Sequence, residues 1–273
     1  MRLKITFKVL NKGTKFPFSY QPFISAWLYN TLANADPLLA NFLHQKGYCL
    51  NNQKFKFFTF SKLYLHNFKT DSEFMQIFDE EVSLIVSGFV PMMLHKLFMG
   101  LFEQQKQLYW GNALYKLQLK VASVEILEPV KFTNTMRFSC ISPMAVGKKE
   151  DNDPTRSKTQ YLSPNDAEFA RFFTLNLIDK YNAALEHGLL DPLPYLPQIV
   201  FKPLAQQVKQ KLITLKKADT AGKDSKARAY LFDFELNAPA DIVKLGYLGG
   251  FGRHNAMGLG MVKIFSEKTF KHN

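Results

Sequence analysis

The residues most suited to chemistry form a glycine-rich segment near the C-terminal end of the chain. Two Gly-apolar-Gly triplets, 250–252 and 258–260, flank the stretch 253–257, which begins with Arg253 and His254. Glycine at this density permits positive φ angles and a close approach of the backbone to a ligand. Backbone N–H groups in such a loop can bind phosphate oxygens. The segment therefore predicts either a phosphate-binding loop or a tight structural turn.

Two common nucleotide-binding motifs do not fit this segment. The dinucleotide-binding fingerprint needs a third glycine at position 255, where Asn255 stands, and it must follow a strand and open a helix. Here the loop is expected to follow a helix and to precede a strand. A Lys-Ser/Thr pair of the Walker type does not follow the glycines either.

His44 is a second candidate for chemistry, because a reference pKa of about 6.5 lets histidine transfer protons near neutral pH. It falls in the last turn of a helix predicted over 37–46, whose C-terminal end favours the imidazolium. A surface histidine at a helix end is the alternative. The spacing H-E-x-x-H, which would indicate a metal site, is not found among the other histidines, and residues 1–69 contain one acid, Asp36. We therefore expect no metal and no cofactor.

Composition and cysteine usage narrow the class of protein. The 273 residues are 47% hydrophobic, which supplies packed cores and favours two domains over one. Two cysteines, Cys49 and Cys140, exclude a disulfide scaffold and multi-cysteine metal sites, and they suit a reducing cytoplasm. No apolar run approaches the roughly 18 residues of a membrane span. The N-terminus also lacks the continuous apolar region of a signal peptide. We expect a soluble cytoplasmic protein that does not bind membranes.

The distribution of charge predicts a polyanionic partner. The formal net charge is +12, and residues 1–69 hold ten basic side chains against the single Asp36. A second basic run lies at 209–228. Such fields favour nucleic acids. A solubilising surface is the alternative, whereas binding to acidic membranes lacks the amphipathic basic helix that it would need.

Hydrophobic periodicity predicts a strand-helix order for the first half of the chain. Alternation in 2–9 indicates a strand, and Asp36, Pro37 and Gly47 suit the N-cap, first turn and C′ position of the short helix. The expected elements are a strand at 2–9, helices at 21–34 and 37–46, strands at 55–65 and 82–87, a helix at 91–105, and a strand at 115–127. This is the β-α-β-β-α-β order of a ferredoxin-like unit.

The second half repeats that order with one hairpin inserted. We expect a strand at 130–141, a polar loop at 143–165, a helix at 165–187, strands at 197–203, 211–217 and 228–236, a helix at 239–246, and a last strand at 259–265. The fold is therefore predicted to be α+β, with tandem ferredoxin-like (RRM-like) β-α-β-β-α-β domains at 1–127 and 128–273. The signature of a true RRM is absent from the sequence.

At the glycine-rich loop the sequence resembles the CRISPR-associated repeat endoribonucleases of the Cas six (Cas6) family, in the RAMP superfamily. The hallmark of that family is a C-terminal loop of this Gly-apolar-Gly form ahead of a final strand. The resemblance covers almost the whole chain. It includes the segments 26–30, 41–44, 57–61, 142–146 and 244–247. Members of the family have tandem ferredoxin-like domains, in agreement with the element order.

The resemblance implies metal-independent cleavage of precursor CRISPR RNA within each repeat. The 2′-hydroxyl attacks the adjacent phosphate and leaves a 2′,3′-cyclic phosphate (or 3′-phosphate) and a 5′-hydroxyl. The family's Tyr-His-Lys set matches Tyr29, His44 and Lys56, with His44 as the acid for the 5′-oxygen. Tyr29 would position the 2′-hydroxyl, since a phenol of pKa about 10 is a poor base; a core tyrosine is the alternative. Lys56 would stabilise the phosphorane, and Lys46 and Lys54 remain alternatives to it.

RNA contacts are expected from the glycine-rich loop and from the second basic run. The predicted residues are Gly250, Gly252, Arg253, His254, Gly258, Gly260, Lys209, Lys211, Lys216, Lys217 and Arg228. CRISPR repeat RNA is the expected partner, whereas membership of an effector complex and homodimerisation stay open. Two other functions are also open: a non-catalytic protein that binds repeat RNA, and a structural subunit of a ribonucleoprotein complex.

Overall fold

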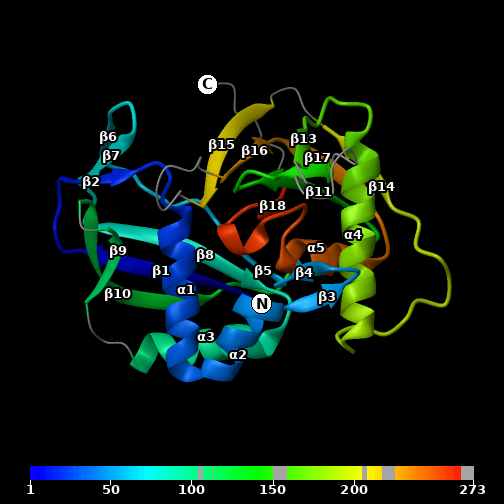
Figure 1. Cartoon of the computed structure of the whole chain (residues 1–273), viewed down its shortest axis with the longest axis horizontal. Coiled ribbons are helices and arrows are strands. Elements are labelled where there is room, and N and C mark those ends of the chain that lie inside the picture. Colours follow the sequence, from blue (N-terminus) through cyan, green and yellow to red (C-terminus); the bar gives the residue numbers. More distant parts are fainter. Residues whose placement is uncertain (104–106, 113, 150–158, 205–207, 217–224, 266–273) are drawn as a thin grey trace, which may run out of the picture.

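The structure, a computed structural model, describes residues 1–103, 107–112, 114–149, 159–204, 208–216 and 225–265. Figure 1 shows two β-sheets side by side. Helix α1 (Gln21–Ala35) lies in front of the first sheet, and helix α4 (Phe169–Glu186) lies in front of the second. The first sheet takes its strands from residues 2–126 and the second from residues 135–264. The domain division at 127/128 stays a prediction.

The first sheet has the strand order β5-β8-β1-β10-β9, and every pair in it is antiparallel. Its strands are β1 (Arg2–Val9), β5 (Phe58–Phe60), β8 (Glu81–Gly88), β9 (Leu108–Gly111) and β10 (Lys116–Ile126). The apolar residues that alternate along β1 are all buried. Phe7 from this strand packs edge-on against Trp27 of α1 and Trp110 of β9. Together with helix α3 (Pro91–Glu103), these elements confirm the ferredoxin-like order.

One predicted strand of the first half is wrong. The segment 55–65 does not form a single strand, because Phe57 has a φ of 51° and separates β4 (Gln53–Phe55) from β5. Strand β4 pairs instead with β3 (Tyr48–Leu50), in a hairpin that follows the short helix. Three further strands, β2 (Thr14–Pro17), β6 (Phe68–Thr70) and β7 (Phe74–Ile77), form a small separate sheet that the periodicity did not predict.

The second sheet has the order β14-β17-β11-β18. Its elements are β11 (Thr135–Cys140), β14 (Val200–Pro203), β17 (Asp233–Asn237), β18 (Val262–Ile264), α4 and α5 (Ala240–Gly249). Phe173 of α4 packs against Phe234 of β17 and Phe251 of the glycine-rich loop, so phenylalanine fills this core.

Two predictions for the second half need correction. The segment 228–236 divides at Phe232 into β16 (Ser225–Leu231), which pairs with β15 (Lys209–Lys216), and β17 of the central sheet. The segment 143–165 is not wholly a loop, since β12 (Val146–Lys149) pairs with β13 (Thr159–Leu162). Along β16 the buried Ala227 and Ala229 flank the exposed Arg228, as expected for a strand with one covered face.

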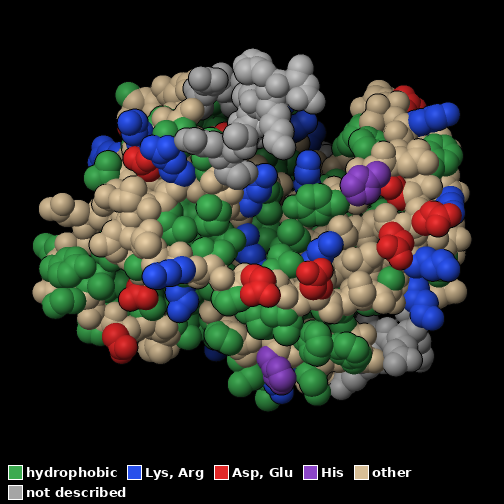
Figure 2. Space-filling model, turned by 180° about the vertical axis from the view of Figure 1, so that it is seen from behind, with side chains coloured by type: hydrophobic (Ala, Val, Ile, Leu, Met, Phe, Trp, Pro, Cys, Tyr) green, Lys and Arg blue, Asp and Glu red, His purple; other side chains and the backbone are tan. Residues whose placement is uncertain are grey.

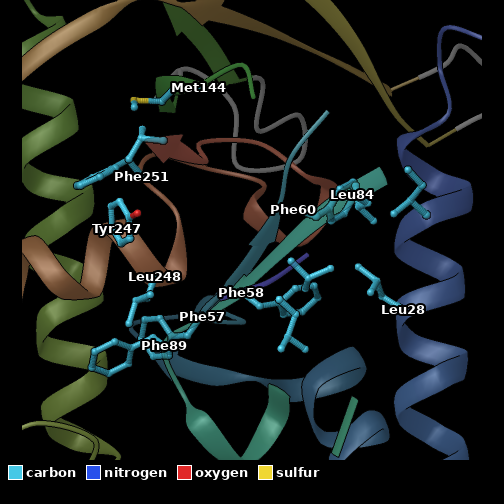
Figure 3. Packing of buried hydrophobic residues seen from close by; sticks show 14 of the residues in the cluster. Leu28, Phe57, Phe58, Phe60, Leu84, Phe89, Met144, Tyr247, Leu248 and Phe251 are labelled. Atoms are coloured by element: carbon cyan, nitrogen blue, oxygen red, sulfur yellow. The ribbon is translucent and has the colours of Figure 1, made fainter. Parts of the chain in front are cut away.

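The two halves share one continuous core. Figure 3 shows Phe58 and Phe60 of β5 between Leu28 of α1 and the C-terminal residues Tyr247 and Phe251. Buried Arg2 adds polar contacts across this interface.

The guanidinium of Arg2 donates to the carbonyl oxygens of Val262 and Tyr247, each at 2.7 Å, and to the hydroxyl of Ser87 at 3.2 Å. It also lies 3.4 Å from the centre of the Tyr247 ring. These hydrogen bonds link strand β1 to α5 and β18. Because the glycine-rich loop connects α5 to β18, its position relative to the first sheet is fixed.

Candidate active site

The aromatic ring of Tyr29 meets the imidazole of His44 edge to face. The ring centres are 5.3 Å apart, and the planes are inclined at 89°. Tyr29 lies half-buried on α1, and burial raises the pKa of its phenol to about 12. His44 is exposed to solvent. The structure thus brings together two of the three predicted catalytic residues, one of them accessible to a substrate.

His44 occupies a single π-helical turn, Phe42–Lys46, that continues helix α2 (Pro37–Asn41). The carboxylate of Asp36 accepts the N–H of Leu39 at 2.9 Å, which confirms the predicted N-cap. Gly47 ends the turn with a φ of 65°, and its N–H bonds to the carbonyl of Phe42 at 2.7 Å. π-Turns of this kind occur frequently at functional sites. Buried Leu43 anchors the turn, so that His44 next to it faces outward.

Lys56 reaches the same turn from the segment between β4 and β5. Its Nζ atom lies 3.2 Å from the carbonyl oxygen of His44, and the Nζ atom of Lys54 lies 2.8 Å from that of Gln45. Lysines at the carboxyl end of a helix complement its dipole. Lys56 is half-buried, and burial together with neighbouring Lys54 lowers its pKa. Of the three candidate lysines, Lys46 belongs to the histidine-bearing turn, Lys54 and Lys56 converge on it, and Lys56 is the one that contacts the main chain of His44.

The four glycines of the glycine-rich loop all have positive φ angles, between 67° and 89°, and all are buried. At Gly258 a Cβ would stand 2.2 Å from the Phe60 ring, and at Gly260 it would stand 1.8 Å from the carbonyl oxygen of Phe251. Several loop amides already donate within the protein, including those of Arg253 to Ala145 and Gly260 to Pro143. The observed geometry is that of a tight turn packed on β5.

A buried lysine that the sequence pattern did not single out holds this turn in shape. The Nζ atom of Lys180, on α4, donates to the carbonyl oxygens of Gly250 and Gly252 and to Oδ1 of Asn255, at 2.5, 2.7 and 2.7 Å. Burial, with Arg253 nearby, lowers the pKa of Lys180 to about 7. The three acceptors match the three N–H donors of an ammonium. The sequence does hold a sign of this role. Lys180 lies three residues after Leu177, on the apolar side of the helix, where a lysine is expected to be buried.

His254 and Arg253 differ in their environments. The Nε2 atom of His254 lies 2.8 Å from the hydroxyl of Tyr161, and burial, with Arg253 next to it, lowers the pKa of His254 to about 4. His254 is therefore neutral at pH 7, whereas Arg253 carries a charge. Of the two, Arg253 is the better candidate for binding a phosphate.

A pocket of about 450 Å³ opens between the β3–β4 hairpin and the glycine-rich loop. Lys54 and Lys56 line one wall, Arg253 and Met257 belong to the other, and Asn176 comes from α4. The predicted phosphorane-stabilising lysine and the predicted phosphate-binding arginine thus border one cavity.

The second basic run lies on the β15–β16 hairpin, where Lys209, Lys211 and Arg228 are exposed. Lys216 ends β15, and Lys217 falls outside the described residues. Figure 2 shows the molecule from behind, with Lys and Arg side chains in the middle among apolar side chains and with acidic side chains just below them. Basic groups are thus available to a polyanion well beyond the pocket.

Within the described ranges, no three His, Cys, Asp or Glu side chains come together in a way that could hold a metal ion. None of the described helices is long and apolar enough to cross a membrane.

Comparison with known proteins gives matches along the whole length. The family model of CRISPR-associated protein Cas6, N-terminal, matches residues 15–120, and that of CRISPR associated protein Cas6, C-terminal, matches residues 126–264. CRISPR-associated endoribonuclease Cas6 1 of Methanocaldococcus jannaschii is 29% identical over 273 residues, which are 100% of this chain and 96% of that protein. CRISPR-associated endoribonuclease Cas6 of Pyrococcus furiosus is 26% identical over 265 residues, covering 96% and 88% respectively.

The fold has a close counterpart among solved structures. The product of a Cas6-related gene from Pyrococcus furiosus superposes with a TM-score of 0.79 at 21% identity, over 98% of this chain and 99% of that one. This likeness supports the tandem ferredoxin-like architecture.

Proposed function

Because the chain belongs to the Cas6 family of CRISPR-associated proteins, we propose that it is an endoribonuclease that cuts precursor CRISPR RNA within its repeats. One observation carries the proposal beyond the family: Tyr29, His44 and Lys56 converge on a single turn of the chain. The ring contact and the Lys56 hydrogen bond join residues from three separate segments. An acid, a cation and a hydroxyl group close together are what cleavage by an internal hydroxyl requires.

In the proposed reaction, a bond forms from the ribose 2′-oxygen to phosphorus, and the bond from phosphorus to the 5′-oxygen breaks. The imidazolium of His44 gives its proton to the leaving 5′-oxygen. The ammonium of Lys56 offsets the charge of the phosphorane. An ammonium has three N–H donors, of which the carbonyl of His44 accepts one, so donors remain for a phosphate oxygen.

Tyr29 acts as a positioning group in this scheme. With a pKa of about 12, its phenol stays protonated at neutral pH and orients the 2′-hydroxyl, whose proton passes to solvent. The products are a 2′,3′-cyclic phosphate (or 3′-phosphate) and a 5′-hydroxyl. None of these steps uses a metal ion, and we propose that the reaction is metal-independent.

Binding of the RNA backbone is assigned to Arg253 and to the exposed Lys209, Lys211 and Arg228 of the β15–β16 hairpin. The buried glycines of the glycine-rich loop shape the surface that Arg253 presents. Neutral His254 contributes a hydrogen-bonding group in place of a charge.

The test is incubation with cognate repeat RNA in excess EDTA, followed by end-group analysis. Wild type should cut at one site and leave a 5′-hydroxyl, whereas His44→Ala should bind but not cut. His95→Ala, which removes an exposed histidine on α3, is the matched control and should cut normally. Lys56→Ala should impair cleavage more than Lys54→Ala. Binding without cleavage by wild type would indicate a non-catalytic RNA-binding protein, and neither binding nor cleavage would indicate a structural subunit.

A further inference from the structure

Asn176 of α4 lines the pocket beside the proposed catalytic lysine, and its Oδ1 atom is buried without a hydrogen-bond partner. Leaving a buried acceptor unpaired costs roughly 1–3 kcal/mol. Such groups are uncommon in folded proteins, and each calls for a reason. Because Oδ1 itself is closed to solvent, a ligand in the pocket reaches it only when the side-chain amide turns about its Cβ–Cγ bond, and a ligand that donates a hydrogen bond there then supplies the missing partner.

The walls around Asn176 are held rigidly by its own helix. Four residues further along α4, Lys180 binds the carbonyls of Gly250 and Gly252, and residues at this spacing share one face of a helix. Asp179 accepts a hydrogen bond from the side chain of Gln53 at 2.9 Å. Helix α4 is thereby tied both to the glycine-rich loop and to the β3–β4 hairpin. A pocket fixed in this way is preorganised for its ligand.

The chemistry of the lining indicates a nucleotide. Lys54, Lys56 and Arg253 supply three cations, and none of the 12 lining residues is acidic. Side-chain amides and the apolar Ala256 and Met257 complete the walls. The volume of about 450 Å³ lies within the range of roughly 300–1,000 Å³ that is usual for small-molecule sites. Cations suit the phosphate, whereas an amide and apolar groups suit the edge and face of an unpaired base.

We propose that this pocket takes one unpaired nucleotide of the RNA next to the cleaved phosphate, and that the Asn176 amide turns toward the pocket so that the base donates an N–H to its Oδ1 atom. The inference rests on the proposed ribonuclease function and adds a residue that determines sequence preference. The phosphate of that nucleotide lies against Lys54 and Arg253, and its base enters the pocket between the hairpin and Met257.

The experiment measures affinity for a set of repeat RNAs that carry a 2′-deoxy nucleotide at the cleaved position. Each RNA has one abasic position, and the set is bound to wild type, to Asn176→Leu and to the control Asn182→Leu on the exposed side of the same helix. For wild type and the control, one abasic position near the cleavage site should weaken binding about 10-fold, the worth of one lost hydrogen bond. Asn176→Leu should bind intact RNA about 10-fold more weakly than wild type does. It should bind the RNA with that abasic position with the same affinity as intact RNA.

Thermal unfolding separates this role from a structural one. Removing an unpaired buried acceptor should leave the melting temperature of Asn176→Leu equal to or above that of wild type, whereas loss of a structural hydrogen bond would lower it. Equal profiles for Asn176→Leu and wild type, with both cutting repeat RNA, would overturn the inference alone. A wild type that neither binds nor cuts repeat RNA would overturn the inference and the proposed function together.

Discussion

Lys56 and His44 are joined through the main chain, because the Nζ atom of Lys56 lies 3.2 Å from the carbonyl oxygen of His44. Gly47 makes this approach possible. A Cβ at Gly47 would lie 2.6 Å from the carbonyl oxygen of Phe55 and 2.9 Å from Cδ of Lys56. The turn that presents the histidine and the side chain that carries the cation are therefore packed as one unit.

Gly47→Ala should damage the proposed site more than the fold. Gly47 has a φ of 65° and a ψ of −165°, a conformation that costs about 1–3 kcal/mol for a residue with a Cβ, and the added methyl group must displace Lys56 and the carbonyl oxygen of Phe55. Cleavage should fall on the order of 100-fold, as expected when a reacting group is shifted by about 1 Å. Gly188→Ala is the control for a positive φ without a steric clash, since Gly188 also has a φ of 65° but no atom within 4 Å of the place where a Cβ would stand. Chemical denaturation and single-turnover cleavage of both variants provide the check, and equal losses in the two would contradict the role of Gly47.

Tyr29→Phe should slow cleavage without changing its pH dependence. Because the phenol has a pKa of about 12, it holds its proton throughout pH 6–9 and cannot act as the base there. Loss of one positioning hydrogen bond should lower kcat about 10-fold. Tyr109→Phe, at an exposed position of β9, should have no effect. The measurement is a pH-rate profile, and disappearance of a rising limb in Tyr29→Phe would identify the tyrosine as a base.

Lys180 should make stability depend on pH between about 7 and 10.5. Its pKa is about 7 in the folded protein and 10.5 when unfolded, so in this window the unfolded chain holds more protons. The free energy of unfolding of wild type should therefore rise with pH relative to that of Lys180→Met, by at most about 1.4 kcal/mol per pH unit. Below pH 7 the difference should be flat.

The check for Lys180 is urea denaturation from pH 6 to 9.5. Lys202→Met on β14, which removes an exposed lysine, should run parallel to wild type. A constant difference between wild type and Lys180→Met across the whole range would show that Lys180 does not titrate on folding.

The basic hairpin should contribute to the salt dependence of RNA binding. Each phosphate contact to single-stranded RNA adds about 0.7 to the slope of log affinity against log salt. Replacing Lys209, Lys211 and Arg228 with Gln, singly and together, should reduce the slope by about 0.7 for each residue that binds a phosphate. Titrations of labelled repeat RNA at several salt concentrations would measure it. Lys120→Gln on β10 should leave the slope unchanged. An unchanged slope in the triple variant would show that the β15–β16 hairpin does not bind RNA phosphates.

Features that depend on neighbouring residues could be predicted from the sequence. The alternation in β1, the apolar stripe of α1 and the cap at Asp36 are properties of short segments, and the structure has them where they were expected. The strand expected at 55–65 failed for a reason that no local pattern contains. Phe57 adopts a positive φ in the structure, where its ring packs against Tyr48 and Phe89.

The α+β class, the basic charge and the residue types available for chemistry could be predicted without a structure, because they follow from composition and from short-range periodicity. Which of those residues lie in contact depends on the folding of the whole chain. Lys180 and Gly250 are 70 residues apart in the chain, and Thr59 reaches the carbonyl of Leu259 across 200 residues. Contacts at such separations are selected by the packing of the two sheets around β5. The close approach of Tyr29, His44 and Lys56 likewise depends on how α1, the π-helical turn and the segment after β4 pack together.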